Sequence, residues 1–245
     1  MRNLKMTIQY DGSKYKGWQK LGDTDKTIQG KIEKVIKEMT KEEIEVIGSG
    51  RTDAGVHALK QVANFHTRSN MTVEEMLDYF YRYLPEDILV TDIEEVDGLF
   101  HSRYHARGKK YLYRIWNARF HNPFLRKFAF HVPEALDIDL MKKASGYLIG
   151  EHDFSSFTSL KSKKKSKVRE LYSIGISREN EQIELMFYGN GFLYNMVRII
   201  TGTLIEVGLG KLDAGEVREI LSRKDRSCAG PTVPPNGLIL YDVEY

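Results

Sequence analysis

The sequence has little cysteine and no long apolar run, and both absences restrict the class of protein. Among the 245 residues only Cys228 is a cysteine, so neither a disulfide framework nor a cysteine-rich zinc site can form. No apolar stretch approaches the roughly 20 residues of a membrane span, and the opening MRNLKMTIQY lacks the apolar core of a signal peptide. We therefore expect a cytoplasmic protein that binds no membrane.

Acidic residues are missing from two stretches, although the net charge of the chain is only +3. Residues 101–114 contain five Lys or Arg and residues 158–169 contain six, with no Asp or Glu in either. Three tyrosines interleave the first stretch, and cations for phosphates beside rings for base stacking suit single-stranded or loop RNA. For the second stretch, KSKKKSK, a solvated loop tip is an equally open interpretation.

The spacing of apolar residues predicts the elements of the first half. Period-two alternation predicts a strand over residues 4–10. Helical spacing predicts amphipathic helices that begin after Thr27 and after Thr72, the second with a capping box. Short strands are expected through residues 44–46 and 62–66. The predicted order is strand, helix, strand, strand, helix, strand.

The second half has a similar order of predicted elements, without detectable sequence repetition. Strands are expected over residues 110–116, 171–177 and 183–188. Asp137 is expected to open a helix that runs through Leu148, and a further helix is expected from about Phe192.

These elements favour an α+β fold with a mixed or antiparallel sheet covered by helices on one face. Residues 97–108 lack a clean period and contain charge and glycine, which is typical of a boundary. We expect two similar subdomains, residues 1–104 and residues 105–245, with the active cleft between the halves.

The most informative segment is GSGRTDAGVH, residues 48–57. Its glycines permit positive φ angles and the close approach of another backbone, so the loop presents the carboxylate of Asp53 and does not bury it in a core. It is neither a dinucleotide-binding fingerprint nor a P-loop, because the third glycine and the GK[ST] ending are missing. From these residues alone, a glycine-rich turn with a chance acid remains the alternative.

GSGRTDAGVHALKQVANF closely resembles the signature of the TruA family, the tRNA pseudouridine synthases that act on the anticodon arm. Further blocks resemble the family's motifs in the family's order over essentially the whole chain. These blocks are YDG with GWQ, TIQ, LPEDI, KYLY, EHDF, FLYNMVR and GPTVPP with GL.

The resemblance implies the chemistry of the site. Asp53 follows Arg-Thr and corresponds to the catalytic aspartate, which serves as nucleophile or as base and must be ionised in either role. Arg198, in NMVR, is expected to form its ion pair. Tyr111 is expected to stack on the uracil and to help move the C5 proton, and Arg51 to stabilise the everted nucleotide. Neither a metal nor an organic cofactor is implied.

The resemblance also implies the partners. We expect tRNA as the substrate and a homodimer, without DNA binding. Phosphate-binding candidates come from the two basic stretches: Arg107, Lys109, Lys110, Lys163, Lys164 and Lys165. A paralogous synthase acting on another RNA, or a catalytically silent RNA-binding protein of the same fold, is the alternative. A metal-dependent phosphodiesterase fits poorly, because His101 and His105 have no partner residues of the expected kind.

Overall fold

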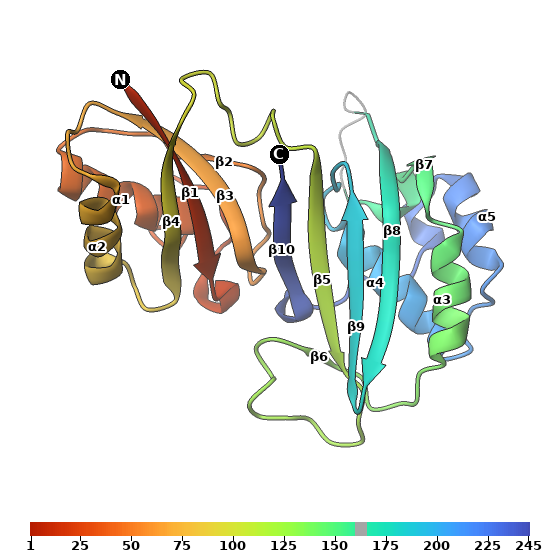
Figure 1. The fold of residues 1–245 in the computed structure, drawn as a ribbon. Helices are drawn as coiled ribbons and strands as arrows, with labels where there is room; N and C mark the ends of the chain where they lie inside the picture. Colours follow the sequence, from red (N-terminus) through yellow and green to blue (C-terminus); the bar gives the residue numbers. More distant parts are fainter. Residues whose placement is uncertain (160–165) are drawn as a thin grey trace. The chain divides into compact units, whose positions relative to one another are not determined.

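The computed structural model describes residues 1–159 and 166–245, and the chain forms two compact units (Figure 1). The first unit contains Met1–Arg107 together with Ile239–Tyr245, and the second contains Gly108–Leu238. The last residues of the chain therefore belong to the first unit, whereas the sequence pattern predicted them to belong with residues 105–245. No helix among the described residues is long and apolar enough to cross a membrane.

In the first unit, a sheet in the order β4-β1-β3-β10 carries two helices, and β2 pairs with β3. Strand β1 runs antiparallel to both of its neighbours, and β10 runs parallel to β3, so the sheet is mixed. The elements are β1 (Arg2–Tyr10), α1 (Ile28–Thr40), β2 (Ile47–Gly48), β3 (His57–Thr67), α2 (Val73–Tyr83), β4 (Ile88–Val96) and β10 (Leu238–Glu244).

Local sequence explains most of these elements. Alternate residues of β1, including Leu4, Met6 and Ile8, are fully buried under the helices, as the period-two pattern predicts. The Thr27 side chain accepts a hydrogen bond from the Gly30 N–H at the start of α1. The capping box predicted at Thr72 is present at the start of α2.

In the second unit, four antiparallel strands follow the order β5-β9-β8-β7, and the short β6 runs parallel to β5. The elements are β5 (Gly108–Trp116), β6 (Phe130–His131), α3 (Ile138–Gly146), β7 (Gly150–Asp153), β8 (Val168–Glu179), β9 (Gln182–Gly189), α4 (Met196–Gly208) and α5 (Glu216–Arg223). In both units the first strand pairs antiparallel with the strand that precedes the second helix, β1 with β3 and β5 with β9. The predicted α+β class with two similar halves is confirmed.

Three predicted boundaries differ from the structure. The strand expected at residues 44–46 lies at Ile47–Gly48, because side chains of α1 bond both the N–H and the C=O of Val46. The helix expected from about Phe192 begins at Met196, because Asn195 adopts a left-handed φ of 61°. The helix that opens at Asp137 ends at Gly146, short of Leu148.

Candidate active site

In the first unit, Asp53 lies on a tight turn between β2 and β3. The N–H of Val56 donates to the C=O of Asp53 at 3.1 Å, which closes the turn, and Gly55 adopts a positive φ of 78° within it. The Asp53 side chain is half-buried. Strand β3 begins two residues after Gly55, so the carboxylate is carried by a short, hydrogen-bonded segment at the end of a sheet strand.

The segment that follows β1 packs its backbone directly against this turn. The Trp18 N–H donates to the C=O of Thr52 at 3.0 Å, and the Gly55 N–H donates to the C=O of Tyr15 at 3.3 Å. A β-carbon added to Gly12 would lie 1.9 Å from the Val56 carbonyl oxygen, so any side chain at this position would clash with the backbone. The approach of two backbones therefore fixes the position of the turn.

Hydrogen bonds of two buried side chains, Tyr10 and His57, also hold this turn in place. The hydroxyl of Tyr10 is hydrogen-bonded to the Thr52 hydroxyl at 2.8 Å, immediately before Asp53. Burial raises the pKa of Tyr10 well above its ordinary value, so its phenol stays protonated. The Gly12 N–H donates to Nδ1 of the buried His57 at 3.1 Å. Together these contacts hold both ends of the Asp53 turn.

The three glycines of residues 48–57 serve different purposes. Of these, only Gly55 uses a positive φ angle. Gly48 is required for close approach, because a β-carbon there would lie 2.6 Å from the indole ring of Trp18. Gly50 accepts a hydrogen bond on its carbonyl from the buried Gln61 side chain at 3.0 Å.

Gly17→Ala is expected to displace the Asp53 turn. Gly17 has a φ of +104°, and a β-carbon there would lie 2.6 Å from the Thr52 carbonyl oxygen. Strain in such backbone regions costs roughly 1–3 kcal/mol, so both the free energy of unfolding and kcat should fall. Gly22→Ala is the matched control, because a β-carbon there meets nothing within 4 Å. Thermal unfolding and turnover measure both effects, and a Gly17→Ala protein that equals wild type in both would contradict this account of the loop.

In the second unit, Tyr111 lies near the start of β5 with its ring largely buried. Its relative exposure is 9%, so only a small part of the residue can reach a ligand. The ring of Phe192 meets it edge to face, with 5.1 Å between the centroids. Phe187 of β9 is the paired residue across the strands. The ring is thus held in one orientation by its neighbours.

Arg198, in the first turn of α4, is held by two hydrogen bonds. Its Nε donates to the C=O of Val233 at 2.7 Å, and its Nη1 donates to Oδ1 of Asn195 at 2.9 Å. Burial raises the pKa of Tyr113, and the positive charge of Arg198 opposes that increase only in part. The guanidinium is therefore oriented by its own unit before any substrate binds.

The remaining predicted residues lie in different parts of the two units. Arg51 is exposed in the same loop as Asp53, and Arg107 is exposed at the end of the first unit. Lys109 and Lys110 lie half-buried on β5, and Lys110 Nζ lies 5.0 Å from the centre of the Tyr188 ring. Lys163, Lys164 and Lys165 lie outside the described residues. Their roles remain predictions.

No group of three His, Cys, Asp or Glu side chains is placed to hold a metal ion in residues 1–159 and 166–245. Nδ1 of His105 accepts a hydrogen bond from the His101 N–H at 3.2 Å, and Nδ1 of His101 accepts one from the Arg103 N–H at 3.1 Å. The i, i+4 spacing of these two histidines is thus explained by a local turn.

Four residues that position a predicted site residue within their own unit have no role in the sequence-based predictions: Tyr10 and Gly17 beside the Asp53 turn, Phe192 beside Tyr111, and Asn195 beside Arg198. Each lies in or beside a sequence block that resembles a family motif, but the blocks do not say which residues touch. The signal that the sequence offered was the pair of glycines, Gly12 and Gly17, in the short polar loop after β1, since glycine permits the close approach of another backbone.

Comparisons with known proteins give one consistent result. A family model described as tRNA pseudouridine synthase matches residues 6–105 and 144–245, which include Asp53 and Arg198 but not Tyr111. The chain is 51% identical over 245 residues, all of both chains, to "tRNA pseudouridine synthase A 2" of Bacillus cereus. It is 55% identical over 230 residues, 94% of each chain, to "tRNA pseudouridine synthase A" of a Bacillus species. It is 46% identical over the full length of both chains to the protein of that name from Acetivibrio thermocellus.

Proposed function

The chain belongs to the family of tRNA pseudouridine synthases, and we propose that it isomerises uridines in the anticodon arm of tRNA with Asp53 as the catalytic residue. The isomerisation breaks the N1–C1′ bond of uridine, turns the uracil and forms a C5–C1′ bond. C5 then loses its proton and N1, which no longer carries the sugar, gains one, so the product is an isomer of the substrate.

The observation that carries the assignment of Asp53 is its position on a turn fixed by two converging backbones. Catalysis needs a carboxylate whose place does not change when the substrate binds. Hydrogen bonds from Val56 and Trp18 and the close approach of Gly12 supply that rigidity. As nucleophile or as base at the sugar, Asp53 acts in its ionised form.

We assign supporting roles to three further residues. Arg198 supplies a positive charge that favours the ionised carboxylate, consistent with the two hydrogen bonds that hold its guanidinium. Tyr111 stacks on the uracil and moves the C5 proton. Arg51, exposed beside Asp53, stabilises the nucleotide after it leaves the base stack.

Mapping of pseudouridine at nucleotide resolution in unmodified tRNA transcripts tests the proposal. Purified protein should modify uridines of the anticodon arm. Modification at other positions, or only in another RNA, would assign the chain to a paralogous activity. Binding of tRNA without any conversion would make it a silent RNA-binding protein.

We further propose that the chain acts in the cytoplasm as a homodimer that grips the body of one tRNA with both copies. The family resemblance is the support for both statements. Sedimentation of the protein with and without tRNA measures the number of copies in the complex, and a complex that contains a single copy would contradict the dimer.

The lysine-rich segment is expected to contribute affinity through phosphates. Replacement of Lys163, Lys164 and Lys165 by alanine should weaken tRNA binding and reduce the slope of log K against log salt by roughly 0.7–0.9 for each phosphate that is no longer bound. The modified positions should stay the same, because lysine reads base edges poorly. Replacement of the exposed Lys142, Lys143 and Lys211 removes the same charge and serves as the control. An unchanged salt slope would identify the segment as a solvated tip.

A further inference from the structure

We propose that the loop of residues 117–129, between β5 and β6, is a second RNA-binding site that takes an unpaired nucleotide of the substrate among its exposed aromatic rings. The proposal rests on the proposed function for the identity of the RNA. The family model leaves this loop unmatched, because its two matched segments end at residue 105 and resume at residue 144.

The loop exposes rings that a monomeric protein would ordinarily bury. Phe124 is 89% exposed and Phe120 is 70% exposed, and Phe124 has the highest exposure of any large apolar side chain among the described residues. With Trp116, at the end of β5, these rings line an open hollow of about 450 Å³. Pockets of several hundred Å³ hold small ligands, so the hollow has room for a base.

The rings are presented by an ordered loop. The Trp116 Nε1–H donates to the C=O of Phe120 at 2.9 Å. Oδ1 of Asn122 accepts from the Phe124 N–H at 2.9 Å. The Asn236 side chain donates to the carbonyls of Arg126 and Ala129 at 3.0 and 2.8 Å. A stacking surface that is fixed in advance loses little conformational entropy when a base binds.

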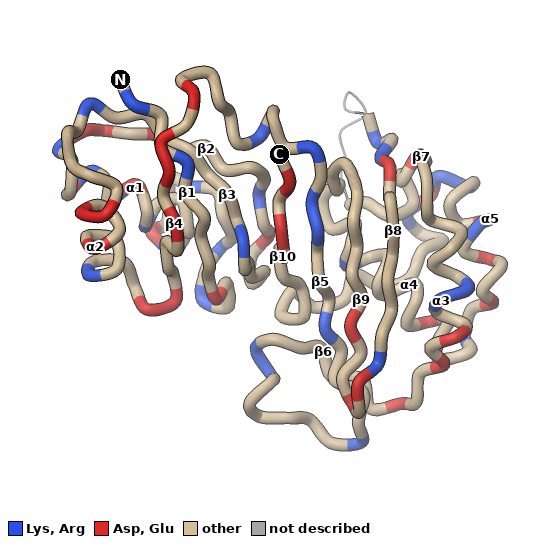
Figure 2. Tube along the Cα trace, viewed as in Figure 1, with Lys and Arg blue, Asp and Glu red and all other residues tan. Residues whose placement is uncertain are grey.

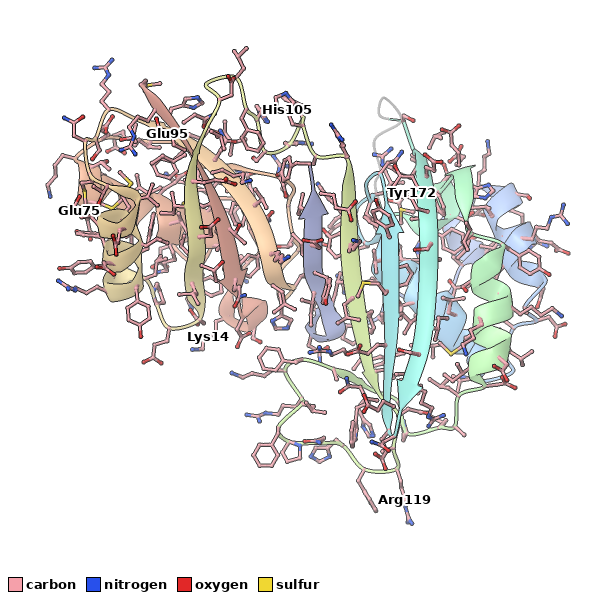
Figure 3. The ribbon with its side chains drawn as sticks, in the orientation of Figure 1. Lys14, Glu75, Glu95, His105, Arg119 and Tyr172 are labelled. Atoms are coloured by element: carbon pink, nitrogen blue, oxygen red, sulfur yellow. The ribbon has the colours of Figure 1, made fainter. Side chains whose placement is uncertain are left out.

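Charge favours a nucleic acid as the occupant. No Asp or Glu occurs between Asp97 and Glu134, whereas this stretch contains eight Lys or Arg. The trace of the loop accordingly carries positive and no negative residues (Figure 2). Arg119, whose guanidinium carbon lies 5.0 Å from the centre of the Phe120 ring, points away from the strands of its unit (Figure 3). Cations for phosphates beside rings for bases are the features of single-strand binding surfaces.

The hollow also offers a polar contact to a base. Glu181, in the turn between β8 and β9, is part of its lining. A carboxylate accepts hydrogen bonds from the amino group of cytosine and similar donors. A self-complementary contact between two copies of this loop would instead bring Arg119 and Arg126 of one copy toward the same cations of the other, which is unfavourable.

The loop lies well away from the proposed uracil site within the same unit. Trp116 follows Tyr111 by five residues along β5, which is roughly 17 Å at about 3.4 Å per residue. A nucleotide at the loop is therefore a different nucleotide from the one that reacts. The loop would therefore bind the RNA at a nucleotide other than the target uridine.

The double variant Phe120→Ala, Phe124→Ala tests the proposal by equilibrium binding of full-length, unmodified tRNA transcript. Loss of base stacking should raise Kd roughly 5- to 140-fold for each base released, with the salt slope unchanged because every phosphate stays bound. Arg126→Gln should instead reduce the salt slope. Tyr81→Ala removes an aromatic ring that is 80% exposed on α2 and should bind tRNA as wild type does.

Two results would overturn the proposal. An unchanged Kd for the double variant would show that the loop does not touch RNA. A raised Kd together with loss of self-association in sedimentation would assign the loop to an interface between copies. Failure of the proposed function would give a different result from either of these. Wild type would then form no pseudouridine in any tRNA, whereas the double variant would still bind tRNA with a raised Kd.

Discussion

Asp53→Asn is expected to lower the rate of pseudouridine formation by roughly 10⁴-fold or more, the upper end of the effect of a single acid–base group. Asparagine keeps the size and shape of the side chain but removes its charge, and an amide is neither an effective nucleophile nor an effective base. The turn itself should persist, because the hydrogen bonds of Val56 and Trp18 that fix it use backbone atoms. Binding of tRNA should persist within several-fold.

Single-turnover assays and binding of unmodified tRNA measure both quantities for this variant. Asp78→Asn is the matched control, since Asp78 is exposed on α2 of the same unit and should not affect turnover. Appreciable activity of Asp53→Asn would exclude Asp53 as the catalytic group. Loss of binding in parallel with turnover would instead indicate that the loop had unfolded.

Tyr111→Phe is expected to slow the reaction by roughly 10²–10⁴-fold while binding of tRNA stays nearly unchanged. Phenylalanine keeps the ring and its edge-to-face packing with Phe192, but it has no hydroxyl to take part in proton transfer. Tyr111→Ala should weaken binding in addition, because the stacking surface is removed.

Single-turnover rates for both variants separate the two roles of Tyr111. Tyr172→Phe removes a phenolic hydroxyl from an exposed position on β8 and serves as the control. If Tyr111→Phe reacts at the wild-type rate, the tyrosine only stacks, and another group must move the C5 proton.

Local sequence was sufficient to predict most elements of the fold. The capped starts of α1, α2 and α3 depend on Thr27, Thr72 and Asp137, each acting on backbone atoms within three residues. The alternation of buried residues along β1 is equally local, because successive side chains of a strand point to opposite faces of the sheet and only one face is covered. Such features need no knowledge of distant parts of the chain.

Features that depend on distant partners could not be predicted in this way. The return of β10 to pair with β3 joins Ile239 to His57, and nothing in either strand specifies the other. The shift of the 44–46 strand depends on Gln29 and Glu33, more than ten residues away. The positioning of Arg198 likewise depends on the carbonyl of Val233.

The measurement that tests the central claim most directly is the release of tritium from tRNA that carries [5-³H]uridine. Formation of a C5–C1′ bond displaces the C5 hydrogen, so wild type should release tritium into water in proportion to the pseudouridine formed, with no free uracil. Asp53→Asn should release none. Absence of release by wild type, or release by Asp53→Asn at the wild-type rate, would contradict the account.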